Sequence, residues 1–323
     1  MKVLITGYAG FIGSNLTAAC VAAGWTVTGA DDFSNGHAEF LSDSTLREIR
    51  EFKCDFSDEA VLQKIRDKEF DVVIHLAAVP RVSYSVEHPF ETNDANVTKT
   101  LKLLETCRGN ISRFVFASSS SVYGGALKLP THESEEKNPK SPYALQKSII
   151  EDYLTLYKTF YGLDSVSLRF FNVFGPNALG GSPYATALAA WLTAIKKGEP
   201  LRFDGDGSQS RDLCYVDNVV DACMKAATAQ LPSAEAHRFN VACGTEVSNN
   251  DIILYLLKRY GGFKLNVAPT RAGDVKRTLA NISGASVYLA YGVKVPVWEG
   301  IARTCDWYDE NWDWARNLKL NVL

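Results

Sequence analysis

The feature that most constrains the fold of this chain is a glycine-rich turn between its first apolar run and its first helical pattern. The turn reads Thr6-Gly7-Tyr-Ala-Gly10-Phe-Ile-Gly13. Gly7 permits a tight turn, Gly10 lets the backbone approach a ligand, and Gly13 lets a helix pack closely on a strand. The N–H groups and dipole of such a helix bind phosphate groups. The turn therefore predicts a strand–turn–helix unit that binds a dinucleotide.

Short apolar runs and helical patterns alternate along the first half of the chain. Strands are expected at Val3–Thr6, Thr26–Ala30, Ile49–Cys54, Val72–Leu76, Phe114–Ser118 and Ser165–Phe170. Helices are expected near Ile12–Ala23, Glu59–Asp67, Asn93–Cys107 and Tyr143–Tyr161. Such alternation predicts βαβ units and a parallel sheet covered on both faces. The expected fold class is α/β, a Rossmann-like doubly wound parallel sheet.

The pattern changes after the segment Phe174-Gly175-Pro176. A Gly-rich loop and a helix ending near Lys197 follow, and then comes a short strand at Leu201–Phe203. Cys214–Ala229 is expected to rejoin the main domain, and the Trp-rich stretch Trp298–Trp314 is expected to form a helix. We therefore predict two domains. The dinucleotide-binding domain comprises residues 1–173 plus about 212–243, and a smaller α/β substrate-binding lobe comprises about 174–211 plus 244–323.

Composition and charge exclude several function classes. The chain is 46% apolar and 22% charged, which is ordinary for a soluble globular protein. A net charge of -3 gives no electrostatic reason to expect nucleic acid or a membrane surface as a partner. Seven cysteines without close pairing argue against both a disulfide framework and a metal site, and favour a cytoplasmic enzyme. The apolar N-terminal stretch is too short and too broken by glycine for a signal sequence or a membrane span.

Tyr143 and Lys147 lie four residues apart in the stretch SPYALQK, where a helix is expected. Residues at this spacing share one face of a helix, so the ammonium group can lie near the phenol. A phenol has a pKa of about 10, and lowering it by roughly three units takes about 4 kcal/mol. A nearby lysine together with a cationic nicotinamide would supply that stabilisation. The pair is a candidate acid–base site, although this spacing alone also arises by chance.

Asp31 stands at the end of the second expected strand, roughly twenty residues after the glycine turn. An acidic group at that offset accepts hydrogen bonds from a cofactor ribose. Its negative charge would repel a 2′-phosphate. The dinucleotide expected is therefore NAD rather than NADP.

The glycine spacing is G-x-x-G-x-x-G, and it occurs together with the Tyr-x-x-x-Lys pair and the serine run SSSSVYG. This combination resembles the extended branch of the short-chain dehydrogenase/reductase superfamily, the NAD-dependent epimerase/dehydratase family. The resemblance covers nearly the whole chain. Further matching motifs are DDFSNG (Asp31–Gly36), CDF (Cys54–Phe56), HLAA (His75–Ala78), LRFFNVFGP (Leu168–Pro176), GDGSQSRDLCYVDN (Gly205–Asn218) and RAGDVKRTLANIS (Arg271–Ser283).

The resemblance implies that NAD is the cofactor and assigns residues to it. Asp55 and Phe56 would flank the adenine, and the stretch Leu76 to Ala78 would pass under the cofactor. His75 is expected to be structural. The full implied set is Gly7, Gly10, Phe11, Ile12, Gly13, Asp31, Asp32, Ser34, Asn35, Gly36, Asp55, Phe56, Leu76, Ala77, Ala78, Tyr143, Lys147 and Phe171.

The same resemblance assigns catalysis to Ser119, Tyr143 and Lys147. Asn172, Arg211 and Arg271 match family positions that contact phosphates, which suits arginine because its fork binds diphosphate oxygens. The substrate set implied is Ser119, Ser120, Tyr143, Asn172, Phe203, Arg211, Arg271, Asp274 and Thr278. No metal is expected. The resemblance also implies a homodimer through the helices near Asn93–Cys107 and Tyr143–Tyr161.

The departures from the family's motifs narrow the reaction. Dehydratases of this branch follow the catalytic residue with Asp-Glu, and decarboxylases carry a Glu before Val-Tyr-Gly, whereas this chain has Ser120 and Ser121. The remaining chemistry is a reversible oxidation at C4 of a UDP-sugar through a 4-keto intermediate. Tyr143 would take the hydroxyl proton while NAD accepts the hydride. We therefore expect an isomerase, a UDP-sugar 4-epimerase of the kind that serves polysaccharide biosynthesis.

The identity of the sugar depends on two positions. Thr278 occupies the family position that gates the sugar pocket, where small residues admit N-acetyl groups, and this favours UDP-GlcNAc/UDP-GalNAc with UDP-Glc/UDP-Gal as a further option. Arg81 follows the fourth expected strand and would face a uronic-acid carboxylate, which keeps UDP-glucuronate or its N-acetylated analogue open. Less favoured functions are those of a dehydratase, a decarboxylase, a reductase and a non-catalytic dinucleotide-sensing protein.

Overall fold

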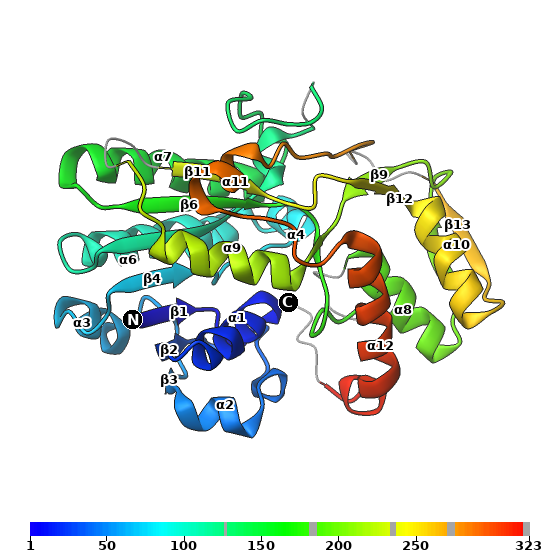
Figure 1. The fold of residues 1–323 in the computed structure, drawn as a ribbon, viewed down its shortest axis with the longest axis horizontal. Coiled ribbons are helices and arrows are strands. Elements are labelled where there is room, and N and C mark those ends of the chain that lie inside the picture. Colours follow the sequence, from blue (N-terminus) through cyan, green and yellow to red (C-terminus); the bar gives the residue numbers. More distant parts are fainter. Residues whose placement is uncertain (126–127, 181–185, 233–236, 270–274, 319–323) are drawn as a thin grey trace.

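The computed structural model of the chain describes residues 1–125, 128–180, 186–232, 237–269 and 275–318 (Figure 1). Its main sheet has seven strands in the order β3-β2-β1-β4-β5-β6-β11, and all of its pairings are parallel. The strands are β1 (Lys2–Thr6), β2 (Thr26–Ala30), β3 (Arg50–Phe52), β4 (Val72–His75), β5 (Arg113–Ser119), β6 (Ser165–Phe170) and β11 (His237–Val241). This order confirms the doubly wound sheet, and the strand order reverses between β1 and β4, where such sheets bind ligands.

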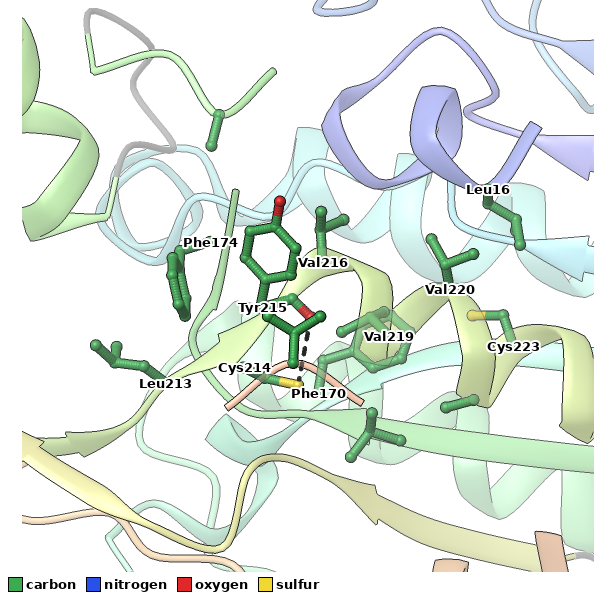
Figure 2. Packing of buried hydrophobic residues seen from close by; sticks show 14 of the residues in the cluster. Leu16, Phe170, Phe174, Leu213, Cys214, Tyr215, Val216, Val219, Val220 and Cys223 are labelled. Atoms are coloured by element: carbon green, nitrogen blue, oxygen red, sulfur yellow. Dashed lines mark hydrogen bonds between the residues drawn. The ribbon is translucent and has the colours of Figure 1, made fainter. Parts of the chain in front are cut away.

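Helices cover both faces of the sheet because the buried side chains of each strand alternate between them. In β1, Val3 and Ile5 belong to one hydrophobic cluster, whereas Leu4 belongs to the other. The first cluster packs against α1 (Phe11–Ala22) and α9 (Val216–Thr228), and Figure 2 shows Leu16 of α1 near Val220 and Cys223 of α9. The second cluster packs against α3 (Glu59–Arg66), α6 (Lys99–Cys107) and α7 (Pro142–Tyr161).

The smaller elements form a second group, and Figure 1 shows α8, α10 and α12 together at one end of the sheet. Its strands pair in twos: β8 with β13 in parallel, β9 with β12 antiparallel, and β7 with β10 in parallel. Their bounds are β7 Val173–Phe174, β8 Leu201–Asp204, β9 Ser210–Asp212, β10 Cys214–Tyr215, β12 Glu246–Ser248 and β13 Leu265–Ala268. Its helices are α8 (Ala187–Lys197), α10 (Asn249–Tyr260) and α12 (Val297–Ala315), whereas α11 (Ser283–Leu289) packs against α9 and against β11 of the main sheet. The domain boundaries given above stay a prediction.

The expected helix near Asn93–Cys107 is more complex than its sequence pattern indicates. Two short helices, α4 (Val82–Glu87) and α5 (Pro89–Asn93), precede it, and a π-helical turn at Asp94–Thr98 leads into α6. The turn places the Asn96 amide so that it bonds both the N–H and the carbonyl of Val79, at 2.8 and 3.0 Å. The irregularity therefore secures the loop after β4. Among the described residues, no helix is both long and apolar enough to cross a membrane.

Candidate active site

A cavity of about 1110 Å³ opens beyond the carboxyl ends of the main strands and is also lined by residues of the second group. It brings together almost all of the predicted site residues. Those that line it are Gly7, Gly10, Phe11, Ile12, Gly13, Asp31, Asp32, Ser34, Asn35, Gly36, Asp55, Phe56, Leu76, Ala77, Ala78, Ser119, Ser120, Tyr143, Lys147, Phe171, Asn172, Arg211 and Thr278. Phe203 is not among the lining residues, because its buried ring packs against Trp191. Arg271 and Asp274 lie outside the described residues.

The glycine turn has the close approaches that the motif predicts. Gly7 has a φ of +73°, and a Cβ there would lie 2.8 Å from the backbone nitrogen of Ala77. A Cβ on Gly13 would overlap the carbonyl oxygen of Gly7. The N-cap of α1 is Gly10. Among the described residues, no side chain caps this helix, and its first turn contains no acidic residue. The uncapped N–H groups therefore fit the diphosphate of a dinucleotide.

The carboxylate of Asp31 is buried beside this turn. It accepts hydrogen bonds from the backbone N–H groups of Ala9 at 3.0 Å and Phe33 at 2.9 Å. Burial raises its pKa to about 6, against the opposing effect of these two donors. Each carboxylate oxygen can accept more than one hydrogen bond, so the group retains capacity for a ribose hydroxyl. Its place in the cavity fits the predicted ribose contact.

Asp55 is held by a partner that sequence reasoning missed. The ammonium group of Lys99 donates to it at 2.7 Å, and the N–H of Ser57 donates at 2.8 Å. Burial opposes ionisation, but these bonds keep the pKa of Asp55 below its usual value. Lys99 also lines the cavity. A pairing between residues 44 positions apart leaves no local pattern that would reveal it.

Tyr143 and Lys147 occupy the first turns of α7. Ser141 caps this helix by accepting a bond from the N–H of Ala144 at 3.2 Å. Both site residues are buried, and the Lys147 Nζ atom lies 5.8 Å from the centre of the Tyr143 ring. Ser119 ends β5, and its hydroxyl lies close enough to the Tyr143 phenol to act on that phenol's pKa in the lowering direction. The three predicted catalytic side chains therefore meet at one point of the cavity.

The electrostatics of this triad differ from the expectation that Lys147 lowers the Tyr143 pKa. Burial raises the pKa of Tyr143 to about 12, against the opposing hydrogen bond from Ser119. Burial also lowers the pKa of Lys147 to about 7. Desolvation is the largest cause of both shifts, so these side chains alone leave the phenol protonated at neutral pH. A base at Tyr143 needs a further positive charge.

His75 lies behind the site and has a structural role, as expected. Its ring nitrogens bond the hydroxyls of Thr6 at 2.7 Å and Thr100 at 3.0 Å. The side chain is fully buried, and this lowers its pKa to about 3. His75 is therefore neutral at physiological pH and joins β4 to β1 and to α6.

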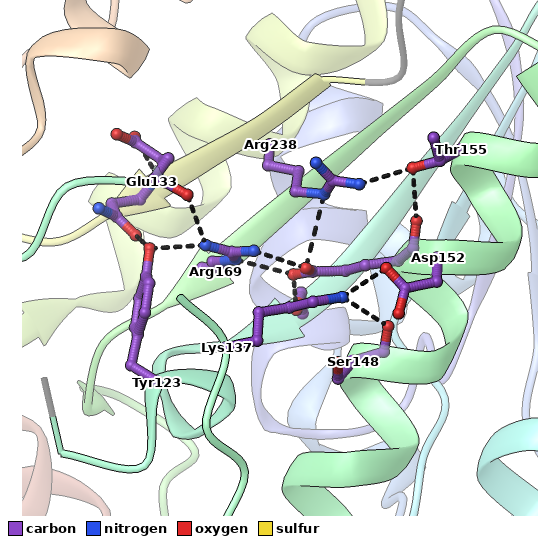
Figure 3. A network of polar contacts seen from close by, with 11 residues as sticks. Tyr123, Glu133, Lys137, Ser148, Asp152, Thr155, Arg169 and Arg238 are labelled. Atoms are coloured by element: carbon purple, nitrogen blue, oxygen red, sulfur yellow. Dashed lines mark hydrogen bonds and ion pairs between the residues drawn. The ribbon is translucent and has the colours of Figure 1, made fainter. Parts of the chain in front are cut away.

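One member of the serine run, Ser118, also belongs to a buried polar network. Ser118 donates to the buried Glu151 at 2.6 Å, and Glu151 forms a two-pronged ion pair with Arg169 at 2.6 and 2.9 Å. Figure 3 shows how Arg169 continues this network to the Tyr123 hydroxyl, at 2.8 Å. The network ties β5, β6 and α7 together behind the site. Ser118 lines the cavity as well, together with Ser119, Ser120 and Ser121.

The opposite wall of the cavity is built around Thr278. Its hydroxyl accepts from the side chain of Asn172 at 3.4 Å and from the backbone N–H of Asp212 at 3.1 Å. Asn172 has a positive φ of 28°, a backbone state that asparagine tolerates better than most residues. Asp212 is fully buried, and burial raises its pKa to about 6 although several backbone N–H groups donate to it. The short Thr278 side chain is thereby fixed at the cavity surface.

Within the described parts of the chain, three arginines line the cavity. Arg211 donates to the carbonyl of Ser210 at 2.9 Å, and Arg81 is half-buried and donates to Ser83 at 3.1 Å. Arg277 pairs with Glu246, and sequence reasoning missed its position in the cavity although it lies beside Thr278. Nothing in the spacing of the RAGDVKRTLANIS motif separates a cavity-facing arginine from an exposed one.

Comparison with known proteins identifies relatives over nearly the full length. The model of the NAD dependent epimerase/dehydratase family matches residues 3–242. The chain is 35% identical over 314 residues to the UDP-glucose 4-epimerase of Mycolicibacterium smegmatis, which covers 95% of this chain and 98% of that relative.

Solved structures share the fold closely. The UDP-N-acetylglucosamine 4-epimerase of Methanobrevibacter ruminantium M1, in complex with UDP-N-acetylmuramic acid, is 35% identical with a TM-score of 0.90, over 96% of this chain and 98% of that one. The UDP-glucuronic acid 4-epimerase of Bacillus cereus, in complex with UDP-glucuronic acid and NAD, is 28% identical with a TM-score of 0.86, over 96% and 99%. The resemblance predicted from the motifs is confirmed.

Proposed function

Because this chain belongs to the NAD-dependent epimerase/dehydratase family and is an NAD-dependent UDP-sugar 4-epimerase, we propose that it interconverts UDP-GlcNAc and UDP-GalNAc. The observation that supports this choice is the wall built on Thr278. Its short side chain is held by Asn172 and Asp212 and leaves room where a tyrosine would fill the cavity. An N-acetyl group adds bulk that such a wall accommodates. The similarity to a UDP-N-acetylglucosamine 4-epimerase supports the same sugar class.

The mechanism assigns one role to each side chain of the triad. When bound, NAD supplies a reversible hydride acceptor for the sugar carbon C4. Tyr143 takes the proton from the C4 hydroxyl and later returns it to the same oxygen. Ser119 holds that oxygen by a hydrogen bond, as its contact with the phenol allows.

The high pKa of Tyr143 determines when it can act. Burial raises this pKa to about 12, so a phenolate needs extra positive charge nearby. The oxidised nicotinamide carries a positive charge, and Lys147 supplies another when protonated. We therefore propose that Tyr143 takes the proton while the cofactor is oxidised, and gives it back when the reduced cofactor returns the hydride to C4.

The 4-keto sugar must expose its second face before it is reduced. The proposed nucleotide contacts with Arg211 and Asn172 hold the diphosphate during this rotation, because an arginine fork binds phosphate oxygens at two points. We also propose phosphate and ribose contacts for Arg271 and Asp274. The serines at 120 and 121 supply no carboxylate to the sugar, which favours epimerisation over elimination of water.

Arg81 supports a second candidate substrate, a UDP-uronic acid. Its half-buried side chain lines the cavity at the start of α4, and Ser85 of that helix accepts a hydrogen bond from the N–H of Tyr143 at 3.1 Å. A carboxylate on the sugar would pair with the Arg81 side chain. UDP-Glc and UDP-Gal also remain candidate substrates, because a pocket that admits an N-acetyl group does not strongly reject a smaller hydroxyl.

We propose that a second copy of the chain covers an apolar surface on α4, α5 and α7. Phe90, Val86 and Phe160 are 88%, 60% and 70% exposed, and α4 and α5 both pack against α7. Monomeric proteins rarely expose extended apolar patches. The proposed surface includes α7, which is one of the two helices expected at the interface, and the use of the helix near Asn93–Cys107 stays a prediction. Light scattering on a Phe90→Asp, Phe160→Asp variant should give a monomer; a monomeric wild type contradicts the proposal.

The cysteines support a reducing environment, since all seven are free thiols. We therefore propose a cytoplasmic location, in agreement with the sequence expectation.

A direct test of the substrate is to incubate the protein as purified, without added NAD, with UDP-GlcNAc, UDP-Glc and UDP-glucuronate separately. Proton NMR distinguishes the C4 epimers in each mixture. The proposal expects UDP-GalNAc to form fastest. A uronate turned over faster than UDP-GlcNAc contradicts it and supports the second candidate substrate, which rests on Arg81.

A further inference from the structure

The segment His37–Phe40 forms part of the cavity wall next to the glycine turn. Both His37 and Phe40 line the cavity, and the N–H of His37 donates to the carbonyl of Ala9 at 2.9 Å. Residues 38–40 form a single 3₁₀ turn, η1 (Ala38–Phe40), in which no described side chain is buried. The segment therefore borders the cavity beside the glycine turn, and none of its side chains is buried.

Two distant parts of the chain hold Phe40 in place. The Asn177 side chain donates to the Phe40 carbonyl at 3.3 Å and to the Ser14 hydroxyl at 3.0 Å. The Phe40 ring meets the Trp314 ring edge-to-face, with centroids 6.3 Å apart. Trp314 is in turn packed at right angles to Trp307 at 5.9 Å and donates to Asn311 at 2.9 Å. The ring that meets Phe40 is therefore anchored in its own helix.

The position of α12 makes this contact a connection between the two element groups. The helix, red in Figure 1, packs against α8 and β10, whereas Phe40 follows β2 of the main sheet. Asn177 and Phe40 also line the cavity themselves. Any movement of the His37–Phe40 segment away from the cavity would also break the Phe40–Trp314 contact.

From this geometry we propose that Trp314, acting through Phe40, is a positioning residue that slows the release of NAD. The proposal rests on the proposed function, because an epimerase that oxidises and reduces the same sugar needs its cofactor to stay bound between the two steps. Trp314 does not line the cavity, so it acts only through the segment that it holds.

The test measures the release of radiolabelled NAD from the loaded protein into an excess of unlabelled NAD, with no sugar present. An edge-to-face aromatic contact is worth about 3- to 10-fold in an equilibrium or rate, so Trp314→Ala should release label about 3- to 10-fold faster than wild type. Trp314→Phe should restore most of the retention because it keeps an aromatic edge. The control is Trp298→Ala, a half-exposed tryptophan of the same helix that packs against Tyr255 instead.

A double variant separates a specific contact from general loosening of the fold. Phe40→Leu removes the same ring pair from the other side. The Phe40→Leu, Trp314→Ala variant should therefore release NAD no faster than the faster single variant. Release rates for Trp314→Ala that equal those of wild type and of Trp298→Ala overturn the proposal. Since the assay contains no sugar, this failure is distinct from a failure to epimerise UDP-GlcNAc.

Discussion

The two halves of the cavity are held in different ways. The cofactor half is built at the ends of β1, β2 and β4, where Gly7, Asp31 and His75 are positioned by backbone pairing and by neighbouring strands. The sugar half is built from segments far apart in sequence, and the Thr278 hydroxyl joins two of them, at Asn172 and Asp212. The cofactor half therefore follows from the sheet, whereas the sugar half depends on long-range hydrogen bonds.

This difference suggests why one scaffold can serve several sugars. A substitution near the glycine turn disturbs the sheet and helix that hold the diphosphate. A substitution at the sugar wall changes one side chain without disturbing the strand ends. The catalytic triad belongs with the cofactor half. Ser119 ends β5 of the main sheet, and Tyr143 lies in the first turn of α7.

The largest effect is expected from Tyr143→Phe. This variant removes the proton acceptor of the catalytic triad, but it keeps the aromatic ring and therefore the packing around that ring. Loss of general acid–base catalysis lowers kcat by about 10²- to 10⁴-fold. Bound NAD should stay at the wild-type level, because the ring remains. Turnover is measured by NMR and cofactor content by absorbance after denaturation. Wild-type kcat in this variant contradicts the catalytic assignment.

The second prediction is that burial keeps His75 neutral in the folded protein. The test compares the unfolding free energy of wild type with that of His75→Gln at neutral and at acidic pH. The folded-state pKa of His75 is about 3, below the unfolded value of about 6.5, so the folded state resists protonation as the pH falls. Between about pH 7 and about pH 4.5, wild type should lose about 3 kcal/mol of unfolding free energy relative to His75→Gln. Urea denaturation of both proteins at the two pH values measures this difference. A difference that does not change with pH shows that His75 is not held neutral.

Gly13→Ala tests the close approach in the glycine turn. The added Cβ would overlap the Gly7 carbonyl, and such overpacking costs about 1–3 kcal/mol, which corresponds to about 5- to 150-fold weaker NAD binding. Gly292→Ala is a matched control, because a Cβ there meets no atom within 4 Å. Calorimetric titration with NAD compares the two variants. Equal NAD affinities of Gly13→Ala and Gly292→Ala would contradict the proposal that the glycine turn determines how tightly the cofactor binds.

The smallest effect is expected in the sugar half, from Thr278→Tyr. The larger ring should lower kcat/KM for UDP-GlcNAc by about tenfold relative to UDP-Glc, because one pocket contact discriminates substrates by this order. Cofactor content should match wild type, since Thr278 lies on the other wall. An unchanged ratio between the two sugars removes Thr278 from the specificity argument.

Sequence reasoning predicted the cofactor half well because its signals are local. A strand, a glycine turn and a helix are adjacent in the chain, and Asp31 follows at a fixed offset, so their placement needs no long-range information. The Lys99–Asp55 pair, the Asp212 hydrogen bonds and the Asn177–Phe40 contact join residues that only the folded topology brings together. The raised pKa of Tyr143 was also missed, since burial is a property of the packed helix and not of the spacing.

The most direct test of the central claim is to run the epimerisation of UDP-GlcNAc in D₂O and to record the C4 position of the product by NMR. Tyr143 is assigned only the hydroxyl proton, and the hydrogen on C4 is assigned to the bound cofactor. The account predicts that the product keeps protium at C4 while the hydroxyl exchanges. Deuterium at C4 would contradict it, because the hydrogen would then have passed through a group that exchanges with solvent.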